Sequence, residues 1–261
     1  MTAGLSVKER DLRRLVRELG AAVVGFSGGV DSALAARISA EELPGRALAV
    51  TGVSPAVPAA ELSAARALAR EIGIPHEVVQ TRELEDPRYV ANPANRCAFC
   101  KTELMSALAP AALRIGGVVV LGVNADDLLD HRPGQEAART RGARFPLAEA
   151  GLTKAEVRSL SKRLGIRAWD KPAQPCLASR IPYGQPVTAG KLARVEAAEA
   201  LLRSEGFRSC RVRHHEGLAS VEVPSGELAR LLEVPRRTRV ESALKALGFL
   251  HVTVDLGGLR S

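Results

Sequence analysis

Aromatic side chains are scarce in this chain: Phe, Trp and Tyr make up only 3% of its 261 residues. The core must therefore be built mainly from Ala, Val and Leu. Few rings are present on which unpaired bases could stack, and such stacking is how most proteins bind single-stranded nucleic acid. The composition thus argues against a nucleic-acid partner of that kind.

Long apolar runs are missing as well. No stretch reaches the roughly 20 residues that a membrane-spanning helix needs, and the first ten residues lack the apolar core of a secretory signal. We therefore expect a cytoplasmic protein without a membrane segment. In that reducing compartment the four cysteines are better explained as metal ligands or reactive thiols than as disulfides.

The net charge of +8 fits anionic ligands such as nucleotides, or an RNA partner. The arginines are scattered and no polybasic tail is present, so a solvated basic surface explains the charge better than an RNA footprint does. With 46% hydrophobic and 25% charged residues the composition is that of an ordinary globular protein. The length suits two domains.

The most informative segment is the run Ser27, Gly28, Gly29, Val30, Asp31 and Ser32, between an apolar strand pattern and a helical pattern. The two glycines permit a tight turn whose N–H groups approach phosphate oxygens, and the helix start adds its positive end. The serine hydroxyls add donors. Asp31 would repel a bare phosphate, so we interpret it as a Mg²⁺ ligand.

This run resembles the PP-loop of ATP pyrophosphatases, S-G-G-x-D-S. It lacks the lysine and serine or threonine that end a Walker A loop, and it lacks the G-x-G-x-x-G of dinucleotide-binding proteins. The resemblance implies that the loop holds the pyrophosphate part of ATP while the α-phosphate is attacked.

Strand and helix patterns alternate through the part of the chain that follows. We expect strands at 21–26, 46–53, 76–80 and 118–122, and helices at 8–19, 31–42, 58–72, 101–113 and 153–164, with an irregular segment at 86–98. This order predicts an α/β fold with a doubly wound parallel sheet, the PP-loop (adenine nucleotide α-hydrolase-like) fold. Ligands of such sheets bind beyond the carboxyl ends of the strands, where Ser27, Thr51 and Asn124 fall.

A stretch rich in proline and glycine at 170–186 marks the expected domain boundary. We predict a PP-loop domain at 1–170, a linker or active-site loop at 171–187, and a smaller α+β domain at 188–261 for substrate contact and oligomerisation. Its predicted strands lie at 209–214, 218–223 and 249–255, and its helices at 188–205, 225–232 and 235–247. The pair of strands between helices is typical of a ferredoxin-like domain.

Three cysteines lie in segments where chemistry is plausible. Cys97 and Cys100 stand where the irregular segment enters a helix, and Cys176 shares a loop with Ser179 and Arg180. Three thiolates are too few for a closed Cys₄ zinc site, but they suit a cubane iron–sulfur cluster with one open iron, which can hold a sulfide for delivery. Cys176 beside cations is also a candidate nucleophile.

Several segments along nearly the whole chain together resemble one family. They are Ser27–Ser32, Cys97–Lys101, Gly122–Asp127, Asp130–Gly134, Cys176–Gly184 and Arg211–His215. The family is that of the LarE sulfur transferases, which act in making the nickel-pincer nucleotide cofactor of lactate racemase. The resemblance implies that ATP adenylates a carboxylate of pyridinium-3,5-biscarboxylic acid mononucleotide, that sulfur then displaces AMP, and that a second round converts the other carboxylate.

The same resemblance bears on the three cysteines. In members with a single cysteine, the one that matches Cys176 donates its own sulfur and is left as dehydroalanine. Other members resemble this chain in having three cysteines, and they carry a [4Fe–4S] cluster that acts repeatedly. We therefore interpret Cys97, Cys100 and Cys176 as cluster ligands and catalytic residues, with the sulfur source unassigned. The resemblance also implies a homo-oligomer, a hexamer of two trimers.

The remaining predicted site residues would hold the nucleotide or the substrate. They are Thr51, Asn124, Asp127, Arg132, Ser179, Arg180, Arg211 and Arg213. Asp127 is a second candidate Mg²⁺ ligand, and Arg132 and Arg180 are candidates for substrate or AMP phosphate. Arg211 and Arg213 alternate along a strand and so face one side. They match a basic pair that the resemblance places at the substrate phosphate, near a subunit contact.

Three residues near the end of the chain are expected to have no part in the chemistry. Cys210 is predicted to be a buried thiol, and His214 and His215 are predicted to be surface histidines.

Other functions stay open. A tRNA thiolase with a PP-loop and a cluster would share the adenylation and the three cysteines, although the few aromatics and the lack of an evident RNA-binding module speak against it. An amide-forming PP-loop enzyme such as an NAD synthetase leaves the cysteines without a task. A nucleotide-binding regulatory protein without chemistry leaves them without one too.

Overall fold

The computed structural model describes residues 3–129, 133–172 and 174–259. The chain forms two compact units, of which the first is Met1–Tyr89 with Asn95–Gln174 and the second is Val90–Ala94 with Pro175–Ser261. Among the described residues, no helix has the length and apolar character that a bilayer span requires.

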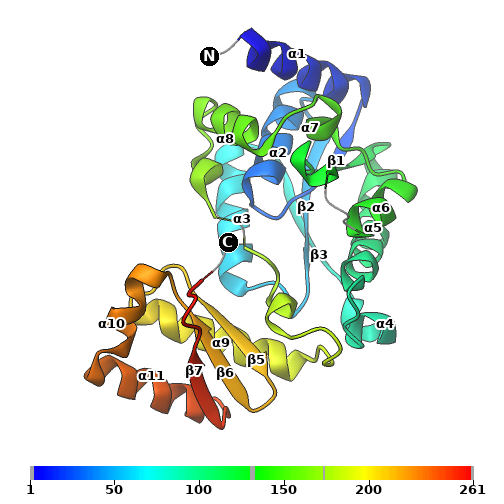
Figure 1. Cartoon of the computed structure of the whole chain (residues 1–261). Helices are drawn as coiled ribbons and strands as arrows, with labels where there is room; N and C mark the ends of the chain where they lie inside the picture. Colours follow the sequence, from blue (N-terminus) through cyan, green and yellow to red (C-terminus); the bar gives the residue numbers. More distant parts are fainter. Residues whose placement is uncertain (1–2, 130–132, 173, 260–261) are drawn as a thin grey trace. The chain divides into compact units, whose positions relative to one another are not determined.

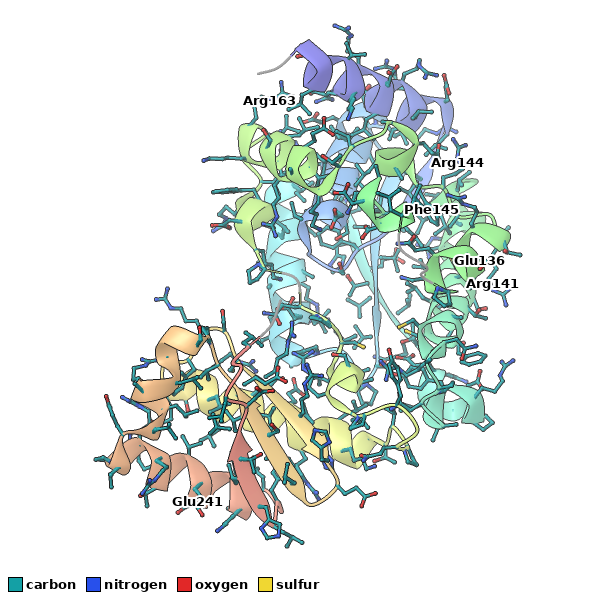
Figure 2. All side chains as sticks on the ribbon, in the orientation of Figure 1. Glu136, Arg141, Arg144, Phe145, Arg163 and Glu241 are labelled. Carbon is teal, nitrogen blue, oxygen red and sulfur yellow. The ribbon has the colours of Figure 1, made fainter. Side chains whose placement is uncertain are left out.

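The first unit is built on four parallel strands in the order β3-β2-β1-β4 (Figure 1). The strands are β1 (Ala22–Gly25), β2 (Ala47–Val53), β3 (His76–Gln80) and β4 (Val118–Leu121). Beyond β4, the chain near Arg144 adds an isolated parallel bridge to Val120. Arg144 and Phe145, labelled in Figure 2, lead from this bridge into the short helix that follows.

Helices connect and cover these strands. Those that begin before Gln174 are α1 (Ala3–Glu18), α2 (Val30–Glu42), α3 (Ala59–Ile72), α4 (Pro87–Val90), α5 (Arg96–Ile115), α6 (Pro133–Thr140), α7 (Pro146–Glu149) and α8 (Lys154–Arg163), with the 3₁₀ turns η1 (Glu83–Glu85), η2 (Asp126–Leu128) and η3 (Arg167–Asp170). The α/β fold predicted from the sequence is confirmed. Helix α5 begins at Arg96 rather than at Lys101, and α6 and α7 were not predicted.

Strand residues alternate between two apolar layers, because side chains on a strand point to opposite faces and this sheet is covered on both. On β1, Ala22 and Val24 belong to the layer that α1, α2, α3 and α8 cover, whereas Val23 belongs to the layer that α5 and α6 cover. Both layers consist mainly of Ala, Val, Leu and Ile, as the scarcity of aromatics requires.

The order of the strands fixes where a ligand binds. From β1 the chain runs through α2 and α3 to β2 and β3 on one side, and then returns through α5 to β4 on the other side of β1 (Figure 1). The direction of winding therefore reverses between β1 and β4. In open α/β sheets, ligands bind outside the carboxyl ends of the strands at this reversal.

The second unit is an α+β unit, as expected. It contains η4 (Leu177–Arg180), α9 (Ala189–Ser204), β5 (Arg211–His215), β6 (Leu218–Glu222), η5 (Ser225–Glu227), α10 (Leu228–Leu232), α11 (Val234–Ala246) and β7 (His251–Val254). Its sheet pairs β5 with β6 antiparallel and β6 with β7 parallel. The ferredoxin-like expectation is wrong, because that topology needs a fourth strand and the described residues form three here.

One early segment of chain belongs to this second unit. The side-chain amide of Asn92 donates to the carbonyls of Pro182 and Gln185, at 2.7 and 2.9 Å. The N–H of Val187 donates to the carbonyl of Val90 at 2.9 Å. These hydrogen bonds tie the segment to the loop between η4 and α9, a pairing that no local sequence pattern signalled.

We expect Gly122→Ala to destabilise the first unit, because a Cβ at Gly122 would lie 2.5 Å from the backbone nitrogen of Ser32, at the start of α2. Overpacking of this kind costs about 1–3 kcal/mol in free energy of unfolding, measured by urea denaturation. The control is Gly4→Ala on α1, where a Cβ meets no atom within 4 Å. Equal urea midpoints for the two variants would contradict the close approach.

Candidate active site

The loop between β1 and α2 is a preformed turn. Gly28 has a φ of 72°, and a Cβ there would come within 3.1 Å of the Cα of Ala65 on α3, so the turn requires glycine. The N–H of Ser27 donates to the Ser32 hydroxyl at 3.2 Å, and that hydroxyl donates to the carbonyl of Gly29 at 3.0 Å. The loop therefore keeps its shape through its own side chains.

Helix α2 directs its N-terminus at this loop. Its N-cap residue is Gly29, which has no side chain that could accept a hydrogen bond. The first N–H groups of the helix are therefore left for another acceptor. The helix is almost entirely buried, from Val30 to Ser39, and its direction is fixed by packing. Free N–H groups and the helix dipole together make a site for an anion such as phosphate.

Three polar side chains converge at the carboxyl ends of β1 and β4. The side-chain amide of Asn124, itself 1% exposed, donates to Asp31 at 3.0 Å and to Asp127 at 2.7 Å. The two carboxylates are thus held within reach of one amide group. Mg²⁺ is usually bound by one or two carboxylates together with substrate phosphates, so the donor set of Asp31 and Asp127 fits this cation.

Lys154, which the sequence analysis did not single out, forms an ion pair with Asp31. It is the first residue of α8, and its N–H donates to Asp126 at 2.8 Å. The start of this helix is fixed by a capping box between Thr153 and Glu156. The pattern T-x-x-E is the sequence signal that could have placed Lys154 at a helix start, although not beside Asp31.

A pocket of about 140 Å³ lies beside the loop. Its charged lining consists of Asp31, Glu61, Lys154, Arg158 and Lys171. Three cations against two carboxylates give the lining a net positive charge, which suits a polyphosphate. Of these five residues only Asp31 was predicted from the sequence to belong to the nucleotide site, because the others come from distant segments.

Thr51 on β2 forms a hydrogen bond to the residue that precedes the PP-loop. It is 5% exposed, and its hydroxyl donates to the carbonyl of Phe26 at 2.6 Å. Nε2 of His76 lies 2.8 Å from the same hydroxyl oxygen and must be the donor there, because the hydroxyl proton already goes to Phe26. Burial and the charge of Arg66 both lower the pKa of His76 and favour the neutral imidazole. The contacts of Thr51 fit a role in fixing the loop.

Cys97 and Cys100 lie near the start of α5. They are three residues apart and so share one side of the helix, with Cys97 exposed and Cys100 half-buried. Gly134 on α6 approaches closely: a Cβ on it would lie 3.0 Å from the carbonyl of Cys97. Helix α6 thereby fixes the turn that carries the two thiols. Two such thiols fit the ligation of a metal or of one edge of a cluster.

Cys176 belongs to the second unit, where it precedes η4 and is half-buried. The hydroxyl of Ser179 donates to the carbonyl of Cys176 at 2.8 Å. Arg180 donates through Nη1 to the carbonyls of Pro175, at 2.7 Å, and of Cys176, at 3.2 Å. The backbone on both sides of the thiol is therefore held in place.

Arg180 is a buried cation with a buried partner. It and Glu199 are each 2% exposed, and Nε donates to a Glu199 oxygen at 2.7 Å. The N–H of Val212 also donates to Glu199, at 3.3 Å. Arg180 is a predicted ligand of substrate or AMP phosphate, but most of its N–H groups already have protein acceptors. Its contacts fit the positioning of the Cys176 loop.

The basic pair on β5 has the predicted alternation. Arg211 and Arg213 are half-buried, whereas Val212 between them is buried. Arg213 forms an ion pair with Glu222 and donates to the carbonyl of Ser179 at 3.4 Å, so this strand lies beside the Cys176 loop. Burial lowers the pKa of the Arg211 guanidinium, and the charge of the nearby Arg180 adds to this.

The predictions for Cys210, His214 and His215 have different outcomes. Cys210 is buried as expected, and burial raises the pKa of its thiol to about 11. The prediction of a surface histidine at His214 is wrong, since it is 1% exposed and packs against Phe249 with ring centroids 5.2 Å apart. Its position on the inward-facing side of β5 explains the difference. His215 is exposed.

The structure thus gathers the predicted residues into two groups. The first unit brings Ser27, Gly28, Gly29, Val30, Asp31, Ser32, Asn124 and Asp127 together, and the second brings Cys176, Ser179, Arg180 and Arg213 together. Cys97 and Cys100 belong to the first unit. Arg132 lies outside the described residues. Within the described part of the chain, no three His, Cys, Asp or Glu side chains form a metal site, and the three-cysteine cluster stays a prediction.

Comparisons with known proteins place the chain in a family. The NAD synthase family matches residues 5–92. An uncharacterized protein of Synechocystis sp. is 47% identical over 258 residues, 98% of this chain and 96% of its own. The pyridinium-3,5-bisthiocarboxylic acid mononucleotide synthase of Lactiplantibacillus plantarum is 36% identical over 262 residues, 99% of this chain and 94% of its own. This chain therefore belongs to the LarE family of PP-loop proteins, that of the pyridinium-3,5-bisthiocarboxylic acid mononucleotide synthase.

Proposed function

We propose that this protein is an ATP-dependent sulfur transferase. It adenylates the carboxylates of pyridinium-3,5-biscarboxylic acid mononucleotide and converts them to thiocarboxylates, in the biosynthesis of a nickel-pincer nucleotide cofactor. The observation that carries this proposal is the PP-loop on the N-terminus of α2, beside a cation-lined pocket, in a chain 36% identical over 99% of its length to a synthase of that product.

The first unit supplies the groups that bind ATP. The N–H groups at the start of α2 bind phosphate oxygens, and Lys154 adds a positive charge beside Asp31. Asp31 and Asp127 would hold Mg²⁺, which when bound offsets negative charge on the phosphates. The buried amide of Asn124 keeps both carboxylates oriented for that task.

Adenylation prepares a poor electrophile for substitution. A carboxylate oxygen of the substrate attacks the α-phosphorus, an O–P bond forms, and the bond to the β-phosphate oxygen breaks so that pyrophosphate leaves. A sulfur nucleophile then attacks the acyl carbon, a C–S bond forms, and the C–O bond to AMP breaks. The donors at the start of α2 favour the first step because they face the charge that develops on the leaving pyrophosphate.

In the proposed mechanism, the three cysteines serve the delivery of sulfur. Cys97, Cys100 and Cys176 would provide the three thiolate ligands of a [4Fe–4S] cluster with one open iron, and such a cluster would supply a bound sulfide. In the alternative without a cluster, the Cys176 sulfur itself forms the C–S bond to the acyl group. Its Cβ–S bond then breaks as the Cα proton is lost, leaving dehydroalanine. In both cases Arg180 holds the Cys176 backbone.

Other parts of the proposal rest on the family resemblance. Arg211 and Arg213 would bind the substrate phosphate near a subunit contact, in a hexamer of two trimers in the cytoplasm. A PP-loop tRNA thiolase is the competing function, and the net charge of +8 is the observation that favours it.

We expect Cys176→Ala to abolish thiocarboxylate formation and to leave pyrophosphate release unchanged, because adenylation does not need the sulfur. Release is measured with Mg·ATP and the pyridinium nucleotide, and the product by mass spectrometry. Cys210→Ala is the control and keeps both activities. Loss of pyrophosphate release in Cys176→Ala would contradict the role of the thiol, and release triggered only by bulk tRNA would overturn the substrate.

Anaerobic purification tests the cluster. We expect a brown protein with iron and sulfide in equal amounts, and we expect Cys97→Ser to lose the colour because it removes a thiolate ligand. Cys210→Ser, which changes a thiol outside the three, keeps the colour. A colourless, iron-free anaerobic preparation would contradict the cluster and favour the cysteine-donating alternative.

A further inference from the structure

The pocket beside the PP-loop contains an ion pair that the chemistry above does not use. Nζ of Lys171 donates to a carboxylate oxygen of Glu61 at 2.7 Å, and the side chains are 24% and 25% exposed. Glu61 belongs to the first turn of α3, and Lys171 directly follows η3. The pair therefore joins two elements across the lining of the pocket.

Arg158 on α8 holds the backbone around this lysine. It donates to the carbonyls of Trp169, at 2.9 Å, and of Lys171, at 3.1 Å. Lys154 is one turn earlier on the same side of α8 and pairs with Asp31. The pocket thus presents three cations, two of which are paired with carboxylates in this structure.

A polyphosphate in this pocket changes the balance of charge. Its oxygens and the carboxylate of Glu61 are anions of the same kind, and they compete for the same ammonium group. A polyphosphate also repels Glu61 at short range, since like charges in a partly buried site are poorly screened. A phosphate group carries more charge than a carboxylate and is therefore the stronger partner for Lys171.

We propose that Lys171, with Lys154 and Arg158, forms the subsite for the pyrophosphate part of ATP, and that the Glu61–Lys171 ion pair is a latch which this group opens by replacing Glu61. The proposal rests on the proposed function, because it names the residues that receive the leaving group. Lys171 precedes Cys176 by only five residues in the chain. When Lys171 exchanges Glu61 for pyrophosphate, the change is therefore passed to the segment between Lys171 and Cys176.

The chain offers a matched control for an ordinary surface ion pair. Arg167 of η3 pairs with Glu71 of α3 at 2.6 Å, with Arg167 78% exposed. This pair joins the same two elements as the latch, and it does not line the pocket. If the latch were only a structural link between α3 and η3, changes to the two pairs would have the same effect on ligand binding.

The test measures binding of inorganic pyrophosphate and of AMP to the full chain by calorimetry, at fixed Mg²⁺ and without the pyridinium nucleotide. Lys171→Met is expected to weaken pyrophosphate binding about tenfold to a hundredfold, the loss typical of a charged hydrogen bond. AMP binding stays unchanged because AMP lacks the outer phosphates. Glu61→Gln is expected to tighten pyrophosphate binding up to about fivefold, because a competitor is removed.

The control variant Glu71→Gln is expected to bind pyrophosphate as the parent chain does. Unchanged or weaker pyrophosphate binding in Glu61→Gln would overturn the latch, and this nearly isosteric variant keeps the test valid if Lys171→Met fails to fold. Equal losses of AMP and pyrophosphate binding in Lys171→Met would also overturn it, because they would show general damage to the site.

Hydrogen exchange tests the coupling. Pyrophosphate is expected to change the exchange of amides between Lys171 and Cys176 in the parent chain and not in Lys171→Met, and no change in the parent chain would overturn the coupling. Binding as predicted, without conversion of the pyridinium nucleotide, would reject the proposed function and keep the latch. Conversion with unaltered pyrophosphate binding in the variants would reject the latch alone.

Discussion

The close approach of the β4 end to the start of α2 is the constraint on which the nucleotide side of this protein depends. Gly122 permits it, and the amide of Asn124 spans it by donating to both Asp31 and Asp127. Two like-charged carboxylates beside a phosphate-binding helix end are unfavourable by themselves. The cations of the neighbouring pocket offset that charge, and the ion pair of Lys154 with Asp31 is the most direct case.

The second unit fixes its reactive loop by a related device. Arg180 and Glu199 are both buried, and burying a charged pair costs free energy unless its hydrogen bonds are nearly complete. Here the pair also binds the carbonyls on both sides of the Cys176 thiol and an N–H of β5. These hydrogen bonds offset the cost of burial and hold the Cys176 loop in one geometry.

The sequence predicted those features that depend on residues close together in the chain. The bounds of β3 agree with the structure, and the PP-loop was identified because its glycines and its following helix are consecutive in the chain. The predicted start of helix α5 lies too far along the chain, because the first turn of the helix follows a segment with prolines. The position of Lys154, Arg158 and Lys171 beside the PP-loop could not be predicted, because tertiary packing alone places them there. For the same reason, burial of His214 and the partners of Arg180 could not be predicted.

The proposed function depends on activation of a substrate carboxylate by its attack on the α-phosphorus of ATP bound at the PP-loop. It is tested most directly by carrying out the reaction with pyridinium nucleotide that contains ¹⁸O in its carboxylates and analysing the phosphate products by mass spectrometry. We expect the label in AMP, one atom for each thiocarboxylate formed, because the bridging oxygen leaves with AMP. Unlabelled AMP, or label in orthophosphate accompanied by ADP, would contradict it.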